Sequence, residues 1–285
     1  MSSLASKAKL GSSPTTPSRQ VFASWANQSW KLLALPMLFF LTVPLVALWT
    51  RVSLAELLTT LQEEQVTQAI TLSLVTSLVT TFTTLIFGTP LAYWLSQRQN
   101  RFTRFADTLI DLPTVLPPSV AGVALLMTFG RRGLFGPALA SLGINIPFTL
   151  VAVIMAQIFV AAPYYIKAAT IGFSGIDKEL KQAAALDGAG SWQAFRFIDI
   201  PLTATAMLSG LVMTWARALG EFGATIIFAG NFPGRTQTMP LAIYIGFEIE
   251  LKVALTLSSI LICLSFLSLM IVKGFLHSQL EAVPS

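Results

Sequence analysis

Very few side chains in this sequence have the type and spacing that enzymatic chemistry requires. The sole histidine, His277, lies near the C-terminus and the sole cysteine, Cys263, lies inside an apolar run. Serine–histidine hydrolysis and a zinc site therefore lack a base or a ligand set. Asp107 and Asp111 are one helical turn apart and imitate an aspartyl pair, but we interpret them as solvated charges at a helix end, because no other apolar run carries a matching aspartate. No G-x-x-x-x-G-K-[ST] phosphate loop occurs, so we predict that the chain is not an enzyme.

Arg217 and Glu221 form a charged pair four residues apart inside the apolar stretch WARALGEFGAT. Charges at membrane depth are costly and are usually paired or face an aqueous cavity. We favour an internal ion pair that fixes helix packing, and Gly220 and Gly223 beside it would allow another helix to approach closely. The functional alternative places Arg217 beside a path for an anion.

A polar segment, residues 177–201, reads DKELKQAAALDGAGSWQAFRFIDIP and interrupts the apolar runs; we call it the knob. Asp177 can cap a short helix that runs to about Asp187, and Gly188 can take the left-handed conformation that ends this helix. Ser191 can cap a second short helix. The sequence therefore predicts two small helices at a tight bend, which form a compact knob outside the membrane. An ordinary loop between two helices is the alternative.

The composition indicates that these residues belong to a membrane protein. Hydrophobic residues make up 54% of the 285 residues, charged residues make up 11%, and the mean hydropathy is +0.71. Charges this scarce do not cover a soluble surface. The net charge of +5 could suggest nucleic-acid binding, but the basic residues lie at the ends of apolar runs. We therefore predict an all-α, multi-pass protein of the lipid bilayer that binds no nucleic acid.

Six apolar runs reach the roughly twenty residues that are needed to cross a bilayer. They cover residues 32–49, 69–95, 109–127, 148–166, 202–229 and 255–275. The N-terminal segment is rich in Ser, Thr and Pro, which predicts disorder. The predicted organisation is a disordered cytoplasmic tail (1–28), a first transmembrane helix with an external loop (29–67), a transmembrane domain that contains the knob (68–276), and a C-terminal tail (277–285).

Lysine and arginine residues are distributed unevenly between the two ends of these runs. Most precede the first run, lie between the second and third or the fourth and fifth runs, or follow the sixth, whereas Glu56, Glu63, Glu64, Glu248 and Glu250 lie in the opposite loops. By the positive-inside rule, the knob and both termini are predicted to be cytoplasmic. The predicted location is the plasma (inner) membrane.

The third run contains three prolines, Pro113, Pro117 and Pro118. Each proline removes a backbone donor, and a bilayer tolerates interrupted helices where neighbouring groups or a water-filled cavity replace the lost hydrogen bonds. Transport pathways are commonly built from such helices, although a kinked packing helix is the alternative. The candidate pathway residues are Thr114, Pro117, Pro118, Ser119, Arg217, Glu221 and Thr225.

The knob resembles the EAA loop, E-A-A-x-x-x-G-x(9)-I-x-L-P, which is the signature of ABC-transporter permease subunits. The matching residues are Gln182, Ala183, Ala184, Gly188, Ile198 and Pro201. Every spacing is kept, although Gln182 replaces the leading glutamate and Ile200 replaces leucine. The resemblance implies the fold of a type I ABC importer permease with a cytoplasmic coupling helix. It also implies that the matching residues, together with Asp187, contact an ATPase.

More specifically, the sequence resembles molybdate permeases of the sulfate/molybdate/tungstate branch. This resemblance rests on LPTVLPP at residues 112–118, GRRG at 130–133, ARALGEFGAT at 216–225 and GNFPGRTQTMP at 230–240. It covers about residue 68 to the C-terminus. Sulfate permeases usually read differently at the two middle motifs, so the sequence favours molybdate (or tungstate), with sulfate as the alternative.

The resemblance also implies a mechanism and a set of partners. A homodimer would form the pathway, ABC ATPase subunits at the cytoplasmic face would use ATP and Mg²⁺, and an external oxyanion-binding protein would deliver the anion for import by alternating access. The chain itself would bind no cofactor. An ATPase-independent channel or scaffold subunit is the alternative from another class. It accounts for the apolar runs and the prolines but leaves the spacing of the knob to coincidence.

Overall fold

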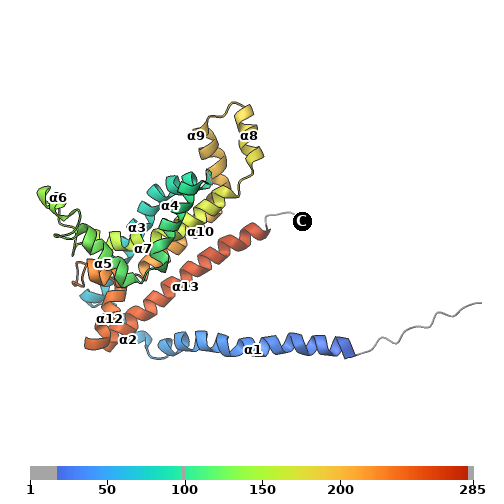
Figure 1. The fold of residues 1–285 in the computed structure, drawn as a ribbon. Helices are drawn as coiled ribbons and strands as arrows, with labels where there is room; N and C mark the ends of the chain where they lie inside the picture. The colour runs from blue at the N-terminus through green and yellow to red at the C-terminus, as the bar shows by residue number, and fades with distance from the viewer. Residues whose placement is uncertain (1–17, 98–99, 282–285) are drawn as a thin grey trace, which may run out of the picture. The chain divides into compact units, whose positions relative to one another are not determined.

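The computed structural model describes residues 18–97 and 100–281 of the chain (Figure 1). By its internal contacts the chain divides into two units, Met1–Thr50 and Arg51–Ser285, which are described separately. The described residues form helices and no strands. The predicted all-α class is confirmed.

The first unit contains one described helix, α1, Ser18–Trp49. From Leu33 onward almost all of its side chains are exposed, including Phe39 and Phe40, as expected for a helix that faces lipid. The helix begins ahead of the predicted tail boundary at residue 28, because residues 20–31 contain neither Gly nor Pro to stop it. Residues 1–17 of the predicted tail lie outside the described residues.

The second unit is a bundle of long helices joined by short ones. Its elements are α2 (Leu54–Thr60), α3 (Glu64–Gln97), α4 (Arg101–Val115), α5 (Pro118–Phe129), α6 (Gly136–Ser141), α7 (Leu150–Ser174), α8 (Lys178–Leu186), α9 (Ser191–Ala194), the π-helix η1 (Phe195–Asp199), α10 (Ile200–Leu219), α11 (Gly223–Phe228), α12 (Met239–Ile249) and α13 (Leu251–Glu281). Figure 1 shows α8 and α9 projecting from the end of this bundle that lies opposite α12. The C-terminal tail predicted from residue 277 continues α13 up to Glu281.

Several of these helices are long and apolar enough to cross a membrane. In the described residues the single helices that qualify are Glu64–Gln97, Leu150–Ser174, Ser191–Leu219 and Leu251–Gly274, and two broken pairs, Leu33–Trp49 with Leu54–Thr60 and Arg101–Val115 with Pro118–Phe129, raise the total to 6 if each pair is one span. The predicted multi-pass organisation is confirmed, and the third and fifth spans differ from the prediction in detail.

The third predicted span is two helices that meet at an angle of 115°, not one kinked helix. Pro113 lies inside α4 without ending it, whereas Leu116 and Pro117 take extended backbone conformations with ψ of 137° and 132°. A residue that precedes proline is biased away from helical geometry. Because Leu116 and Pro117 both precede a proline, two successive residues are pushed out of the helix, and the chain turns.

The fifth predicted span, residues 202–229, is also interrupted. Helix α10 ends at Leu219, Gly220 follows as its C-cap, and α11 begins at Gly223 after Phe222, whose φ is −127°. Beyond α11, the predicted external loop continues into the apolar helix α12. The backbone N–H of Met239 in the first turn of α12 donates to the buried Ser73 hydroxyl of α3 at 2.7 Å, which fixes the end of this loop on the bundle.

The centre of the bundle is formed by α3, α7 and α10, which pack through small and polar side chains. A Cβ added to Gly210 of α10 would lie 2.8 Å from the Ala168 Cβ of α7, so the two helices approach as closely as glycine allows. Buried Gln157 of α7 donates to the Thr76 hydroxyl at 3.1 Å and accepts from the Thr80 hydroxyl at 3.0 Å. Polar contacts between helices suit an interior in which water is absent.

Candidate functional site

In the knob, residues 177–201, the short helix α8 meets the start of a long helix at a tight bend. The second helix is not the separate short one that the sequence predicted, because α9 continues through η1 into α10 as one helix, Ser191–Leu219. The Asp177 carboxylate accepts from the Glu179 backbone N–H at 3.0 Å and caps α8. Gly188 has a φ of +83°, the left-handed conformation in which glycine ends a helix. The cap of the second helix is Gly190, not the predicted Ser191, which is already the first residue of α9. The Gly190 N–H donates to the Gln193 side-chain oxygen at 2.8 Å, and no side chain caps the first turn of α9.

The knob is polar by composition but exposes several large apolar side chains among its charged ones. No residue of α8 is buried, and the exposed side chains of the two helices and η1 include Leu180, Leu186, Trp192 and Phe197. Of the signature residues, Gln182, Ala183, Asp187, Gly188 and Pro201 are exposed, and Ala184 and Ile198 are half-buried. An exposed apolar patch of this kind marks a site of interaction with another molecule.

Aromatic rings attach the base of the knob to the long helices. The Tyr93 ring of α3 lies 4.7 Å from the Phe195 ring of η1 and 5.3 Å from the Phe173 ring of α7, measured between centroids, in edge-to-face arrangements. Such pairs stabilise packing beyond the area that they bury. The base of the knob is therefore packed against α3 and α7.

The two broken helices meet each other. A Cβ added to Gly223, at the start of α11, would lie 2.7 Å from the Pro118 Cβ and 3.4 Å from the Ser119 nitrogen at the start of α5. The helices then run together through a shared cluster that includes Ala121, Leu125, Ala224 and Phe228. The structure thus brings the candidate pathway residues Pro118 and Ser119 to the second break.

Arg217 and Glu221 form the predicted ion pair, with 2.8 Å between Nη1 and Oε2. Glu221 lies beyond the end of α10 and is 1% exposed, and its Oε1 accepts from the Ala224 N–H at 2.8 Å. The Glu221 carboxylate therefore pairs with Arg217 and also accepts a hydrogen bond from the first turn of α11. The preferred interpretation, an ion pair that fixes packing, agrees with this geometry.

The other candidate pathway residues lie in different surroundings. Pro117 is exposed beside Ser119, and Thr114 is exposed on α4, where its hydroxyl donates to the Asp111 carbonyl at 2.7 Å. Thr225 is 0% exposed. The structure does not bring Thr225 to the exposed face that Pro117 and Ser119 occupy.

Asp107 and Asp111 are partly exposed, as the sequence indicated, with 42% and 43% of their side chains accessible. They lie inside α4 and not at its end, and both carboxylates bind the Lys167 ammonium of α7, at 2.7 Å and 2.8 Å. Residues four apart share one face of α4. No sequence pattern pointed to Lys167, because it is 60 positions from Asp107.

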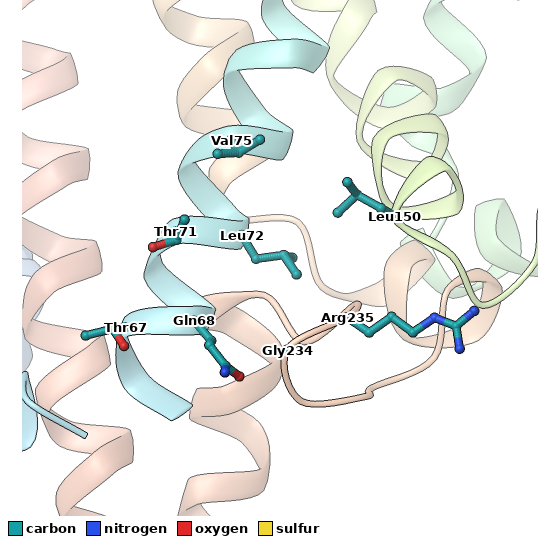
Figure 2. Close-up of a pocket in the computed structure, with 8 residues that line it drawn as sticks. All are labelled: Thr67, Gln68, Thr71, Leu72, Val75, Leu150, Gly234 and Arg235. Atoms are coloured by element: carbon teal, nitrogen blue, oxygen red, sulfur yellow. The ribbon is translucent and has the colours of Figure 1, made fainter. Parts of the chain in front are cut away.

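Two cavities lie at the end of the bundle opposite the knob, and Arg235 lines both. One, of about 540 Å³, is lined by Thr67, Gln68, Thr71, Leu72, Val75, Leu150, Gly234 and Arg235 (Figure 2). Figure 2 shows the Arg235 guanidinium pointing away from Gln68, to the side on which Leu150 lies. The other, of about 510 Å³, is lined by Leu126, Arg131, Asn145, Pro147, Phe148 and Arg235. Two arginines from separate loops therefore share this second cavity.

One known protein family matches more than half of the chain. The family described as "Binding-protein-dependent transport system inner membrane component" matches residues 85–279. The chain belongs to this family. The prediction of an ABC-transporter permease subunit is confirmed, and the permease is a multi-pass component of an inner membrane.

Two relatives and one solved structure show how far the similarity extends. The permease is 37% identical over 244 residues to the "Probable transport system permease protein NifC" of Clostridium pasteurianum, which covers 85% of each chain. It is 36% identical over 236 residues to the "Molybdenum transport system permease protein ModB" of Mycobacterium tuberculosis, covering 83% of this chain and 89% of the relative. A bacterial ABC transporter involved in the import of the acidic polysaccharide alginate aligns with a TM-score of 0.72 at 16% identity over 93% of this chain and 99% of the other. This structure supports the fold alone, and the predicted type I importer fold is confirmed.

Besides the contacts of Lys167, a second pairing between charged residues of the permease was not predicted from the sequence. Asp199 is 0% exposed, and its Oδ1 lies 3.2 Å from the Lys181 ammonium of α8. Asp199 occupies the variable position of the I-x-L-P part of the signature, so the signature assigns no role to the residue at this position. An acidic residue between two apolar ones, Ile198 and Ile200, was the sequence feature that could have indicated a buried charge. The described residues contain no group of three or more His, Cys, Asp or Glu that could hold a metal ion.

Proposed function

We propose that this chain is the permease subunit of an ATP-driven importer of molybdate, with tungstate as a second substrate of the same shape and charge. Membership of a binding-protein-dependent transport family supports the importer. The names of similar proteins, which specify molybdenum transport, favour molybdate over sulfate. The observation that carries the coupling to ATP is the knob, because exposed apolar side chains on a base packed against the long helices suit docking to a separate ATPase.

Each end of the bundle would bind a different kind of partner. ABC ATPase subunits would bind the knob at the cytoplasmic face, and a binding protein would dock at the opposite, external face, which carries the arginine-lined cavities. The excess of basic residues at the knob end supports this orientation, with both termini cytoplasmic.

A second copy of the chain would complete the pathway. Pro117, Pro118 and Ser119 are exposed at a break in the membrane-spanning region, where an unpaired backbone is tolerated only against protein or water. In a homodimer these residues would line the passage between the two copies, and ATP-driven closure of the ATPases would switch its access.

The proposed function is tested by ATPase activity in proteoliposomes that contain the permease, its ATPase and the binding protein. Binding protein loaded with molybdate or tungstate should stimulate ATP hydrolysis by about fivefold or more, whereas binding protein offered sulfate should not. Stimulation by sulfate would move the permease to the sulfate branch with the mechanism unchanged. Failure to assemble with an ATPase would contradict the permease function and favour a channel or scaffold.

The external cavity that Arg131 and Arg235 share gives a second expectation. Each guanidinium can form two parallel hydrogen bonds to an oxyanion, and two positive charges at a cavity mouth concentrate anions. Replacing both with glutamine should lower the maximal rate of molybdate uptake by about fivefold or more in low salt, and the loss should shrink in high salt.

Arg132→Gln is the matched control, because Arg132 is adjacent in the same loop and lines neither cavity. This variant should transport normally. If Arg132→Gln lost as much uptake as the double variant, or if the concentration of binding protein that gives half-maximal uptake rose while the maximal rate held, the arginines would serve docking of the binding protein and not the anion.

A further inference from the structure

Asp199 is a buried charged group that the proposed function does not yet use. It lies in η1, between the knob helices and α10, and is 0% exposed. A buried carboxylate is costly unless it is paired with an opposite charge and held by hydrogen bonds. The groups around Asp199 must therefore offset the cost of burying its carboxylate.

Three separate elements converge on the pair that Asp199 makes with Lys181. The Lys181 ammonium of α8 lies 3.2 Å from the Asp199 carboxylate of η1 and 5.4 Å from the centre of the Tyr93 ring of α3. A cation over an aromatic face is attracted by the ring. One cation thus links the first knob helix to two membrane-spanning elements.

The link is important because α8 has little else to hold it. None of its residues is buried, and its apolar side chains Leu180 and Leu186 face outward. The Lys181 side chain, by contrast, is only 26% exposed. The orientation of α8 on the bundle therefore depends strongly on where Lys181 is anchored.

We propose that Lys181 and Asp199 are positioning residues that hold α8 at a fixed angle to α3 and α10, so that movement of a docked ATPase is transmitted to the spans. The proposal rests on the proposed function, because it requires an ATPase at the knob. A buried ion pair often adds little net stability, and its best-attested use is to fix one arrangement among several.

The test compares variants reconstituted with the ATPase and binding protein. Lys181→Met removes the anchor, Lys181→Arg keeps the charge, and Lys178→Met removes the same charge from an exposed site on the same helix. We expect Lys181→Met to lower the stimulation of ATPase activity by molybdate-loaded binding protein about fivefold per assembled complex, while the basal ATPase activity per assembled complex holds. Lys181→Arg should retain most of the stimulation, and Lys178→Met should match the unaltered permease.

The double variant Lys181→Met/Asp199→Asn separates positioning from folding. It leaves no unpaired buried charge, so the yield of assembled complex should return toward that of the unaltered permease, whereas stimulation should stay low because α8 remains unanchored. Normal stimulation in the double variant, or equal effects of Lys181→Met and Lys178→Met, would overturn the positioning role. If the unaltered permease bound no ATPase, the proposed function would fail first, and the positioning role with it.

Discussion

Replacing Gly188 with aspartate is expected to lower molybdate uptake at least about tenfold without preventing insertion or assembly of the permease in the membrane. Gly188 has a φ of +83°, a conformation that costs most residues with a side chain roughly 1–2 kcal/mol. A Cβ there would meet nothing within 4 Å, so the loss cannot come from a clash inside the subunit. It should come from a changed bend between α8 and α9 and from a charge on the docking surface. Uptake by whole cells, normalised to the amount of permease in the membrane, is the measurement.

A second substitution at the same position separates these two causes. Gly188→Ala is strained by the left-handed conformation at least as much as aspartate is, but it adds no charge. If uptake is lost only with aspartate, the charge at the ATPase contact is responsible, and if both variants lose uptake, the bend is. Normal uptake by Gly188→Asp at normal abundance would remove Gly188 from the coupling surface.

The knob could be predicted closely because its structure is determined by local signals. A carboxylate at Asp177 and a glycine at Gly188 act within a few residues of their positions, and this is the range that a sequence displays directly. Two local details differ from the prediction. The helix begins one residue earlier, with Gly190 and not Ser191 at the N-cap, and it does not end within the knob but continues into α10.

The breaks in the third and fifth spans could not be placed in the same way. A hydropathy profile shows the length of an apolar run but does not show a sharp turn within that run. Prolines marked the third span, but Pro113 is accommodated inside α4 while Pro117 and Pro118 end it. The fifth span breaks where Gly223 packs on Pro118, a contact between residues that are far apart in the sequence.

The charged residues show the same limit. The Arg217–Glu221 pair was predictable because four residues span one helical turn. Asp107 and Asp111 also share a turn, yet each binds Lys167 from another helix, and the same holds for Asp199 with Lys181. The sequence shows which charged residues lie near or within apolar runs. Only the packed helices show which of these residues pair with one another.

Arg217 and Glu221 are expected to give unequal losses of stability when they are replaced singly. Arg217→Met leaves the Glu221 carboxylate charged and 1% exposed with no counter-ion, which should destabilise the complex by about 3 kcal/mol. Glu221→Gln leaves an arginine whose side chain is 28% exposed and can be hydrated. Its amide oxygen can still accept from the Ala224 N–H, so the loss should be nearer 1 kcal/mol. The measurement is the temperature at which the purified complex in detergent loses its assembled form.

The double variant Arg217→Met/Glu221→Gln decides between the two roles that the sequence allowed. If the pair only fixes packing, removing both charges should restore much of the stability and most of the uptake, because no buried charge remains unpaired. If Arg217 instead attracts the anion, stability should recover while molybdate uptake stays low. The geometry supports the first outcome, because Glu221 neutralises Arg217 at 2.8 Å and a neutralised arginine has little attraction left for a passing dianion.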